Sequence, residues 1–299
     1  MAEIKNYGEA WKGGDKPFAA SYGKLMMWFF LITDTLTFSA FLASYGFSRF
    51  KYQDIWPVPE DVFTHFPFLH GEHPLLFVAL MTFILIMSSV TMVLAVNYGH
   101  KMQKNKVILW LSLTIVGGCM FLGSQAWEWG HFIHGDKGGI ETKTEFVVHI
   151  SEGDKISSVY DLMGVDGHDG NHYHFTIDDV VKSLEKKSEY NIRKADRTIL
   201  SNSESIDYLK KNGSQVILGA NLVNNEYGHR LFADYFFFIT GFHGFHVFSG
   251  VVILIIILIN VIKGTYERRG HYEMVEKVGL YWHFVDLVWV FVFTFFYLV

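Results

Sequence analysis

Long apolar runs alternate with polar stretches along this chain. Five of the runs are long enough to cross a bilayer, since about 20 helical residues span a hydrocarbon core about 30 Å thick. They cover residues 25–47, 75–98, 107–133, 231–262 and 278–299. Because a helix satisfies its own backbone hydrogen bonds in lipid, we predict an all-α membrane protein with five transmembrane helices in a bundle.

The connection between the third and fourth runs, residues 134–230, is too long for a loop and differs in composition. Strands are predicted at 144–150 and 215–221. Helices are predicted at 180–187, after a capping pattern formed by Thr176 and Asp179, and at 203–211, before Gly213. We therefore predict a small α+β extramembrane insertion. The chain then divides into 1–133 with three spans, the insertion at 134–230, and 231–299 with two spans.

Basic residues are concentrated in the N-terminal segment and in the second and fourth connections. They are Lys5, Lys12, Lys16, Lys24, Lys101, Lys104, Lys106, Lys263, Arg268, Arg269 and Lys277. The positive-inside rule then places the N-terminus in the cytoplasm, and the insertion and the C-terminus on the outer face. Residues 1–23 contain no apolar core segment, so we expect the first span to act as the targeting signal.

Charge and cysteine content exclude several classes. The net charge is −5 and the acidic residues are concentrated outside the spans, so nothing favours a nucleic-acid partner. The single cysteine, Cys119, lies within the third span. A disulfide framework and a cysteine metal site are therefore excluded.

The spans carry polar side chains, which are costly in lipid and need partners. Helical spacing puts His243 and His246 on one face of the fourth span, and Gln125 and Glu128 on one face of the third. Rise per residue gives depths of roughly 8–14 Å from the cytoplasmic boundary for one set of these groups. That set comprises Asp34, His243, His246, His283 and Asp286. We predict one polar cluster in the inner leaflet, with Glu128 separate near the outer surface.

Several chemistries fit these groups. Paired histidine and aspartate side chains can fix helix register by mutual hydrogen bonds, or form a proton relay or lipid headgroup site. Haem ligation by two histidines, or a copper or zinc site from His243, His246 and His283, is a further alternative. In the insertion, His168, His172 and His174 form either a metal-binding loop or a solvated turn.

Three segments resemble a known family. Thr-Gly-Phe-His-Gly-Phe-His-Val (240–247) and Tyr-Trp-His-Phe-Val-Asp-Leu-Val-Trp (281–289) are similar to the two signature segments of subunit III of the haem-copper cytochrome c oxidases. Gln-Ala-Trp-Glu-Trp (125–129) resembles that family's Gln-x-x-Glu segment. The first span resembles the one that carries a membrane-embedded glutamate, with Asp34 in its place. Five spans match the shorter bacterial form, whereas the insertion has no counterpart there.

The resemblance implies a multi-pass subunit of a bacterial inner membrane that binds no haem or copper itself. Its partners would be the catalytic subunit I, which holds haem and copper, together with subunit II, a small subunit IV and bound phospholipid. It implies support of proton uptake and of the stability of subunit I. On this reading the intramembrane polar residues hold the spans together. Lipid or interface contacts would come from Gln125, Glu128, Trp282, Lys263, Arg268 and Arg269.

Other function classes remain open. An independent ion channel or transporter would use the inner-leaflet polar groups as an ion path, and would be expected to show inverted repeats, of which the sequence has no sign. A haem-bearing oxidoreductase would give a Soret band in the isolated chain. The insertion is expected to dock an electron donor or a neighbouring respiratory complex.

Overall fold

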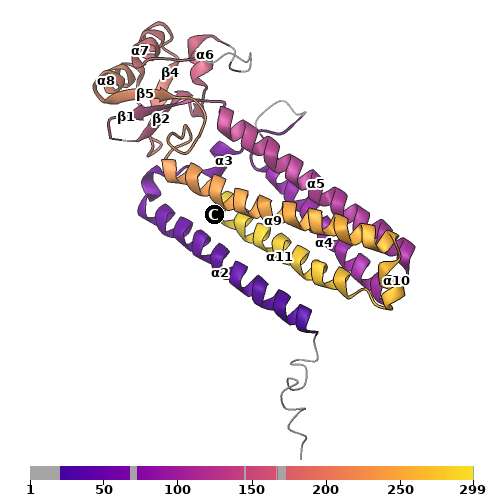
Figure 1. Cartoon of the computed structure of the whole chain (residues 1–299). Helices are drawn as coiled ribbons and strands as arrows, with labels where there is room; N and C mark the ends of the chain where they lie inside the picture. Colours follow the sequence, from indigo (N-terminus) through magenta and orange to yellow (C-terminus); the bar gives the residue numbers. More distant parts are fainter. Residues whose placement is uncertain (1–20, 68–72, 145, 166, 168–172, 299) are drawn as a thin grey trace, which may run out of the picture.

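The long helices lie side by side and carry a small domain at one end (Figure 1). The computed structural model describes residues 21–67, 73–144, 146–165, 167 and 173–298 of the chain. All five helices are long and apolar enough to cross a membrane, which confirms the predicted fold class. They are α2 (Tyr22–Lys51), α4 (Leu76–His100), α5 (Lys104–His134), α9 (Arg230–Ile262) and α11 (Glu273–Phe293).

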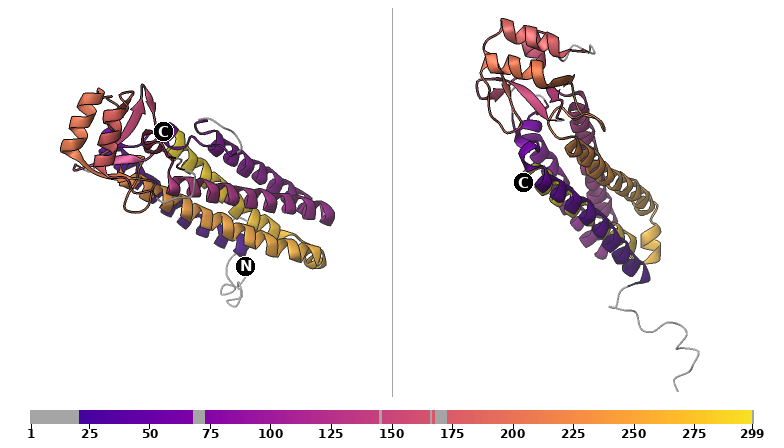
Figure 2. Two further views of the ribbon diagram at one scale, coloured as in Figure 1. Left: turned by 90° about the horizontal axis from the view of Figure 1, so that it is seen from above. Right: turned by 90° about the vertical axis from the view of Figure 1, so that its left-hand side faces the viewer.

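Helix α11 lies at the centre of the bundle and α2 at its periphery. Of the most apolar part of each span, 56% is buried in the last span, which begins with α11, against 17% in α2. Helix α11 packs on α4, α9 and α2, while α4 runs along α5 and α5 along α9 (Figure 2). Shorter elements cover the ends of the bundle. They are η2 (Gln53–Ile55), α3 (Pro59–Val62), α10 (Thr265–Arg269) and a π-helical turn, η3 (Thr294–Leu298).

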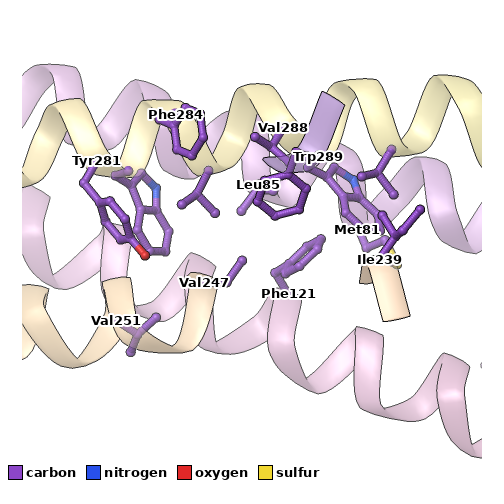
Figure 3. Packing of buried hydrophobic residues seen from close by; sticks show 14 of the residues in the cluster. Met81, Leu85, Phe121, Ile239, Val247, Val251, Tyr281, Phe284, Val288 and Trp289 are labelled. Carbon is purple, nitrogen blue, oxygen red and sulfur yellow. The ribbon is translucent and has the colours of Figure 1, made fainter. Parts of the chain in front are cut away.

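Large aromatic side chains of α11 fill the space between the other helices. Trp289 packs edge-on against Phe121 of α5, with Met81 of α4 nearby (Figure 3). Trp282 is fully buried against Gly118 of α5, where a Cβ would come within 2.6 Å of the indole ring. Glycine at this position therefore allows α5 to approach the large ring.

In its described residues, the insertion contains a five-stranded antiparallel sheet and three short helices. The strands follow the order β3-β2-β1-β5, and β4 also pairs with β2. The strands are β1 (Gly139–Thr142), β2 (Val147–Glu152), β3 (Lys155–Ile156), β4 (Tyr190–Arg193) and β5 (Gly213–Ile217). The helices are α6 (Val159–Met163), α7 (Ile177–Lys186) and α8 (Asn202–Asn212). Its apolar core, which includes Ile140, Val180 and Leu209, is distinct from that of the bundle. The predicted α+β insertion is thus confirmed.

Capping chemistry sets where the insertion helices start. Thr176 and Asp179 form a reciprocal capping box ahead of α7, and Ser201 and Glu204 form another ahead of α8. Both helices consequently begin earlier than predicted, because residues after the cap are already helical. The strands β1, β3 and β4 and the helix α6 were not predicted, since each has five residues or fewer and shows no clear periodicity.

A narrow neck joins the insertion to the bundle. Gly135, which follows α5, and Gly219, which follows β5, are in direct contact, and both have left-handed backbone angles (φ 72° and 76°). A Cβ on Gly219 would overlap the carbonyl oxygen of Ile133. The buried carboxylate of Glu226 accepts backbone hydrogen bonds from Asp136 (3.1 Å), Lys137 (3.3 Å) and Gly219. The segment that enters the insertion and the segment that leaves it are therefore held together at the same place.

Candidate functional site

His243 joins the two C-terminal spans. It lies on α9, is fully buried, and its Nε2 is 3.0 Å from the backbone carbonyl oxygen of Val285 on α11. A carbonyl can only accept, so the proton is on Nε2 and that nitrogen donates. The imidazole ring contacts the rings of Phe121 and Trp289, with centroids 5.7 Å and 5.1 Å away. This hydrogen bond therefore links α9 to α11 within a buried aromatic core.

His246 faces the first span instead. Its Nδ1 donates to the carbonyl oxygen of Phe242 at 2.8 Å, one turn earlier on α9. Its Nε2 lies 3.2 Å from Oδ2 of Asp34 on α2, an ion-pair distance without hydrogen-bond geometry. Helix α2 has few other buried contacts. The His246–Asp34 pair is thus one of the main polar links that hold α2 to the bundle.

His283 and Asp286 face α4. The Nδ1 of His283 is 2.7 Å from the hydroxyl of Ser89 on that helix. Ser89 also lies near Asp286. Both carboxylate oxygens of Asp286 are buried and, among the described residues, neither has a partner with hydrogen-bond geometry. Of the acidic groups at this site, Asp286 alone has two buried carboxylate oxygens without a hydrogen-bond partner among the described residues.

The predicted inner-leaflet residues therefore do not form one continuous hydrogen-bonded cluster. The structure divides them among three helix pairs: α9 with α11, α9 with α2, and α11 with α4. Among the described residues, no group of three or more His, Cys, Asp or Glu side chains converges in a way that could hold a metal ion. His168 and His172 lie outside the described residues, so the loop hypothesis is addressed only at His174.

Glu128 forms a separate buried site nearer the insertion. Gln125 donates to its Oε2 at 2.9 Å, and the hydroxyl of Tyr297 lies 3.1 Å from each carboxylate oxygen. Gln125, Glu128 and Trp282 are all buried inside the bundle. This corrects the expectation that these three residues face lipid or a partner, because helices of the same chain already cover them.

The basic candidates Lys263, Arg268 and Arg269 are exposed at the end of α9 and on α10. Helix α10 lies at the end of the bundle away from the insertion (Figure 1). These cations are therefore open to a lipid surface or solvent at that end.

Three partners in the site were missed in the sequence. Ser89 belongs to the adjacent pair Ser88-Ser89 within an otherwise apolar span, and such small polar residues often bond across helices. Ser88 accepts a hydrogen bond from the indole of Trp282 at 3.1 Å. Tyr297 carried no signal, because its place opposite Glu128 depends on the final π-helical turn.

Comparison with known proteins identifies the C-terminal part of the chain. The family model for cytochrome c oxidase subunit III matches residues 225–299. A probable cytochrome c oxidase subunit 3 of Rickettsia conorii is 46% identical over 70 residues, which is 23% of this chain and 24% of the relative. The cytochrome c oxidase subunit 3 of Synechocystis is 45% identical over 69 residues, 23% of this chain and 29% of the relative.

These matches are local. The chain aligns with only about a quarter of the length of the first of these relatives. The aligned region contains α9 and α11, and with them His243, His246, His283 and Asp286. Residues 225–299 of the chain are thus similar to cytochrome c oxidase subunit III.

Proposed function

We propose that the chain serves as subunit III of a respiratory haem-copper oxidase and carries no redox centre of its own. The observation that carries this proposal is that the family match falls on the two helices joined by the His243–Val285 contact. In this role the chain packs against subunit I, the oxygen-reducing and proton-pumping subunit, and stabilises it. Subunit II and a small subunit IV complete the complex.

The buried polar groups support a part in lipid binding and proton uptake. Helix α2 exposes large apolar side chains such as Trp28, Phe29 and Phe30, a surface suited to acyl chains or to a partner helix. Asp34 on that helix keeps an oxygen that is buried without a hydrogen bond, as does Asp286 on α11. We infer that phospholipid lies along α2 and that Asp34 assists proton entry to subunit I.

The proposed location is a bacterial inner membrane, with the N-terminus in the cytoplasm and the insertion and C-terminus in the periplasm. Exposed Lys263, Arg268 and Arg269 at the α10 end fit the cytoplasmic surface, where basic residues meet lipid phosphate. The insertion lies at the opposite end of the bundle (Figure 1). There it would dock an electron donor or a neighbouring respiratory complex.

The test is purification of the tagged chain from membranes in mild detergent. We expect haem-bearing oxidase subunits to co-purify, and we expect the chain separated from them to be colourless. A Soret band in the isolated chain would favour the haem-bearing alternative, and absence of any oxidase subunit would reject the proposal. Deleting residues 136–227 tests docking: we expect the oxidase to assemble and to lose its donor, whereas retention of the donor would reject the docking role.

A further inference from the structure

A cavity lies where the insertion meets the outer end of α2. Its volume is about 440 Å³, within the usual range for small-ligand sites. One wall comes from the end of α2 and from the segment that runs through η2 to α3. The other comes from β2, β4 and the turn after β4. The bundle and the insertion thus both contribute to the lining of this cavity.

The cavity is lined by more cationic than acidic side chains, and its acids are largely engaged within the chain. Asp61 lies 3.7 Å from Nη2 of Arg193. Asp196 accepts hydrogen bonds from the backbone and hydroxyl of Thr198 in its own turn. The oxygens of Glu226 point at the backbone of the neck, and burial raises its pKa to about 7, so its negative charge is only partial near neutrality.

Two arginines of the lining are less fully paired than these acids. The Nη1 of Arg49 is buried and has no hydrogen-bond partner in the part of the chain that the structure describes. Arg197 forms no ion pair with any described residue and lies at the tip of the turn Lys194–Thr198 in a left-handed conformation (φ 65°). Such a conformation is unfavourable for a residue with a Cβ and is often kept where a side chain must be presented.

Among the other groups of the lining, Asp54 is acidic and Lys137 is basic, whereas His149 adds no charge. Burial lowers the pKa of His149 to about 4, so its imidazole is neutral at ordinary pH, and Nε2 donates to the carbonyl oxygen of Glu226. Lys194 directs its ammonium over the ring of Tyr208, 5.2 Å from the centroid. The positive charge at the cavity comes from two lysines and three arginines, and the planar forks of the guanidinium groups match phosphate oxygens.

We propose that this cavity binds a phosphate-bearing anion, with Arg49 and Arg197 as its cationic contacts. The ligand is a soluble phosphate or the headgroup of an anionic phospholipid, since the α2 end of the cavity lies at the boundary of the span. The site is independent of the proposed oxidase role, because residues 134–228 supply most of one wall and the role rests on residues 225–299.

The experiment is calorimetric titration of the full chain in mild detergent, at constant ionic strength, with inorganic phosphate in one arm and short-chain phosphatidylglycerol in the other. We expect saturable 1:1 binding in at least one arm. Binding of inorganic phosphate would assign the soluble source, and binding of phosphatidylglycerol alone would assign the lipid.

The variants Arg49→Gln and Arg197→Gln should each weaken that binding about tenfold, the loss expected for one charge-assisted hydrogen bond. Lys182→Gln, an exposed cation on α7 away from the cavity, is the matched control and should leave binding unchanged. Arg197 is exposed, so its variant remains informative even if Arg49→Gln disturbs folding. Absence of saturable binding in both arms, or wild-type affinity in Arg197→Gln, would overturn the proposal.

Discussion

The hydroxyl of Tyr297 lies 3.1 Å from both carboxylate oxygens of Glu128, although 169 positions separate the two residues. Both side chains are buried, and Gln125 is the other hydrogen-bond donor to the carboxylate. The contact ties the end of the chain to α5. The buried carboxylate therefore has two donors among the described residues, one from Gln125 and one from Tyr297.

Tyr297→Phe is therefore expected to destabilise the protein by about 1–3 kcal/mol, because it leaves the carboxylate short of a donor. The measurement is thermal or denaturant unfolding in detergent. Tyr272→Phe is the matched control: that tyrosine is also buried, but its hydroxyl has no partner among the described residues. Equal effects of the two substitutions would show that the Glu128 contact contributes nothing.

The pair His246 and Asp34 can be tested by a double-mutant cycle. We expect Asp34→Asn and His246→Gln to be coupled by about 1–3 kcal/mol, as is usual for polar groups in contact. Thr33→Val supplies the reference, since its hydroxyl bonds only to the backbone of its own helix. If the effects of the two substitutions on the free energy of unfolding are additive, the 3.2 Å contact between His246 and Asp34 does not stabilise the protein.

His243→Leu should lower the yield of the assembled complex while leaving the haem signal of each assembled complex normal. The substitution removes the donor to the Val285 carbonyl and loosens α9 against α11. Phe245→Leu, on the exposed face of α9, should leave the yield unchanged. A normal yield of complex with a lost haem signal would instead indicate that His243 acts in the redox chemistry.

The neck should respond to pH through two groups with opposite signs. Burial raises the pKa of Glu226 to about 7 from 4.5, so its contribution to stability is present below pH 4.5 and is lost as pH rises through 7. Burial lowers the pKa of His149 to about 4 from 6.5, so its contribution is present above pH 6.5 and is lost as pH falls through 4. Between pH 4.5 and 6.5 the two slopes oppose each other.

Wild-type hydrogen exchange in the insertion should thus vary little between those pH values. Glu226→Gln should expose the acid sensitivity due to His149, and His149→Gln the loss of protection with rising pH due to Glu226. Each effect is limited to about 3 kcal/mol, from a shift of 2.5 units at 1.36 kcal/mol per unit. Identical pH profiles for wild type and both variants would contradict the assignment.

Gly219→Ala should destabilise the insertion more than Gly164→Ala. Both glycines have left-handed backbone angles (φ 76° and 73°), so both substitutions carry the conformational cost of about 1 kcal/mol. Only at Gly219 would the new methyl group overlap the Ile133 carbonyl, whereas Gly164 has open space. Limited proteolysis of the insertion measures the difference, and equal cleavage rates would argue against a tight neck.

The spans could be predicted from sequence because length and hydropathy decide whether a helix crosses lipid. The capping box ahead of α7 could be predicted because it rests on two residues three apart, Thr176 and Asp179. Local spacing also showed that His243 and His246 share a face. It could not show that one turns to α11 and the other to α2, because that depends on how neighbouring helices rotate and pack.

The same limit explains the depth prediction. Counting residues placed Asp34 and His246 in one layer of the inner leaflet, at opposite ends of the range of roughly 8–14 Å, and the structure brings them together. A place in that layer did not, however, bring His283 or Asp286 into hydrogen-bond contact with that pair. Counting residues gives only the position of a side chain along the membrane normal. Its position within the membrane plane depends on tertiary packing.

The contact between Gly135 and Gly219 has a consequence for the spacing of the helices on either side. A segment whose two ends meet can be exchanged for a short turn without changing the separation of the helices on either side. Because Gly135 and Gly219 meet, the separation of α5 and α9 does not depend on the length of chain between these two glycines.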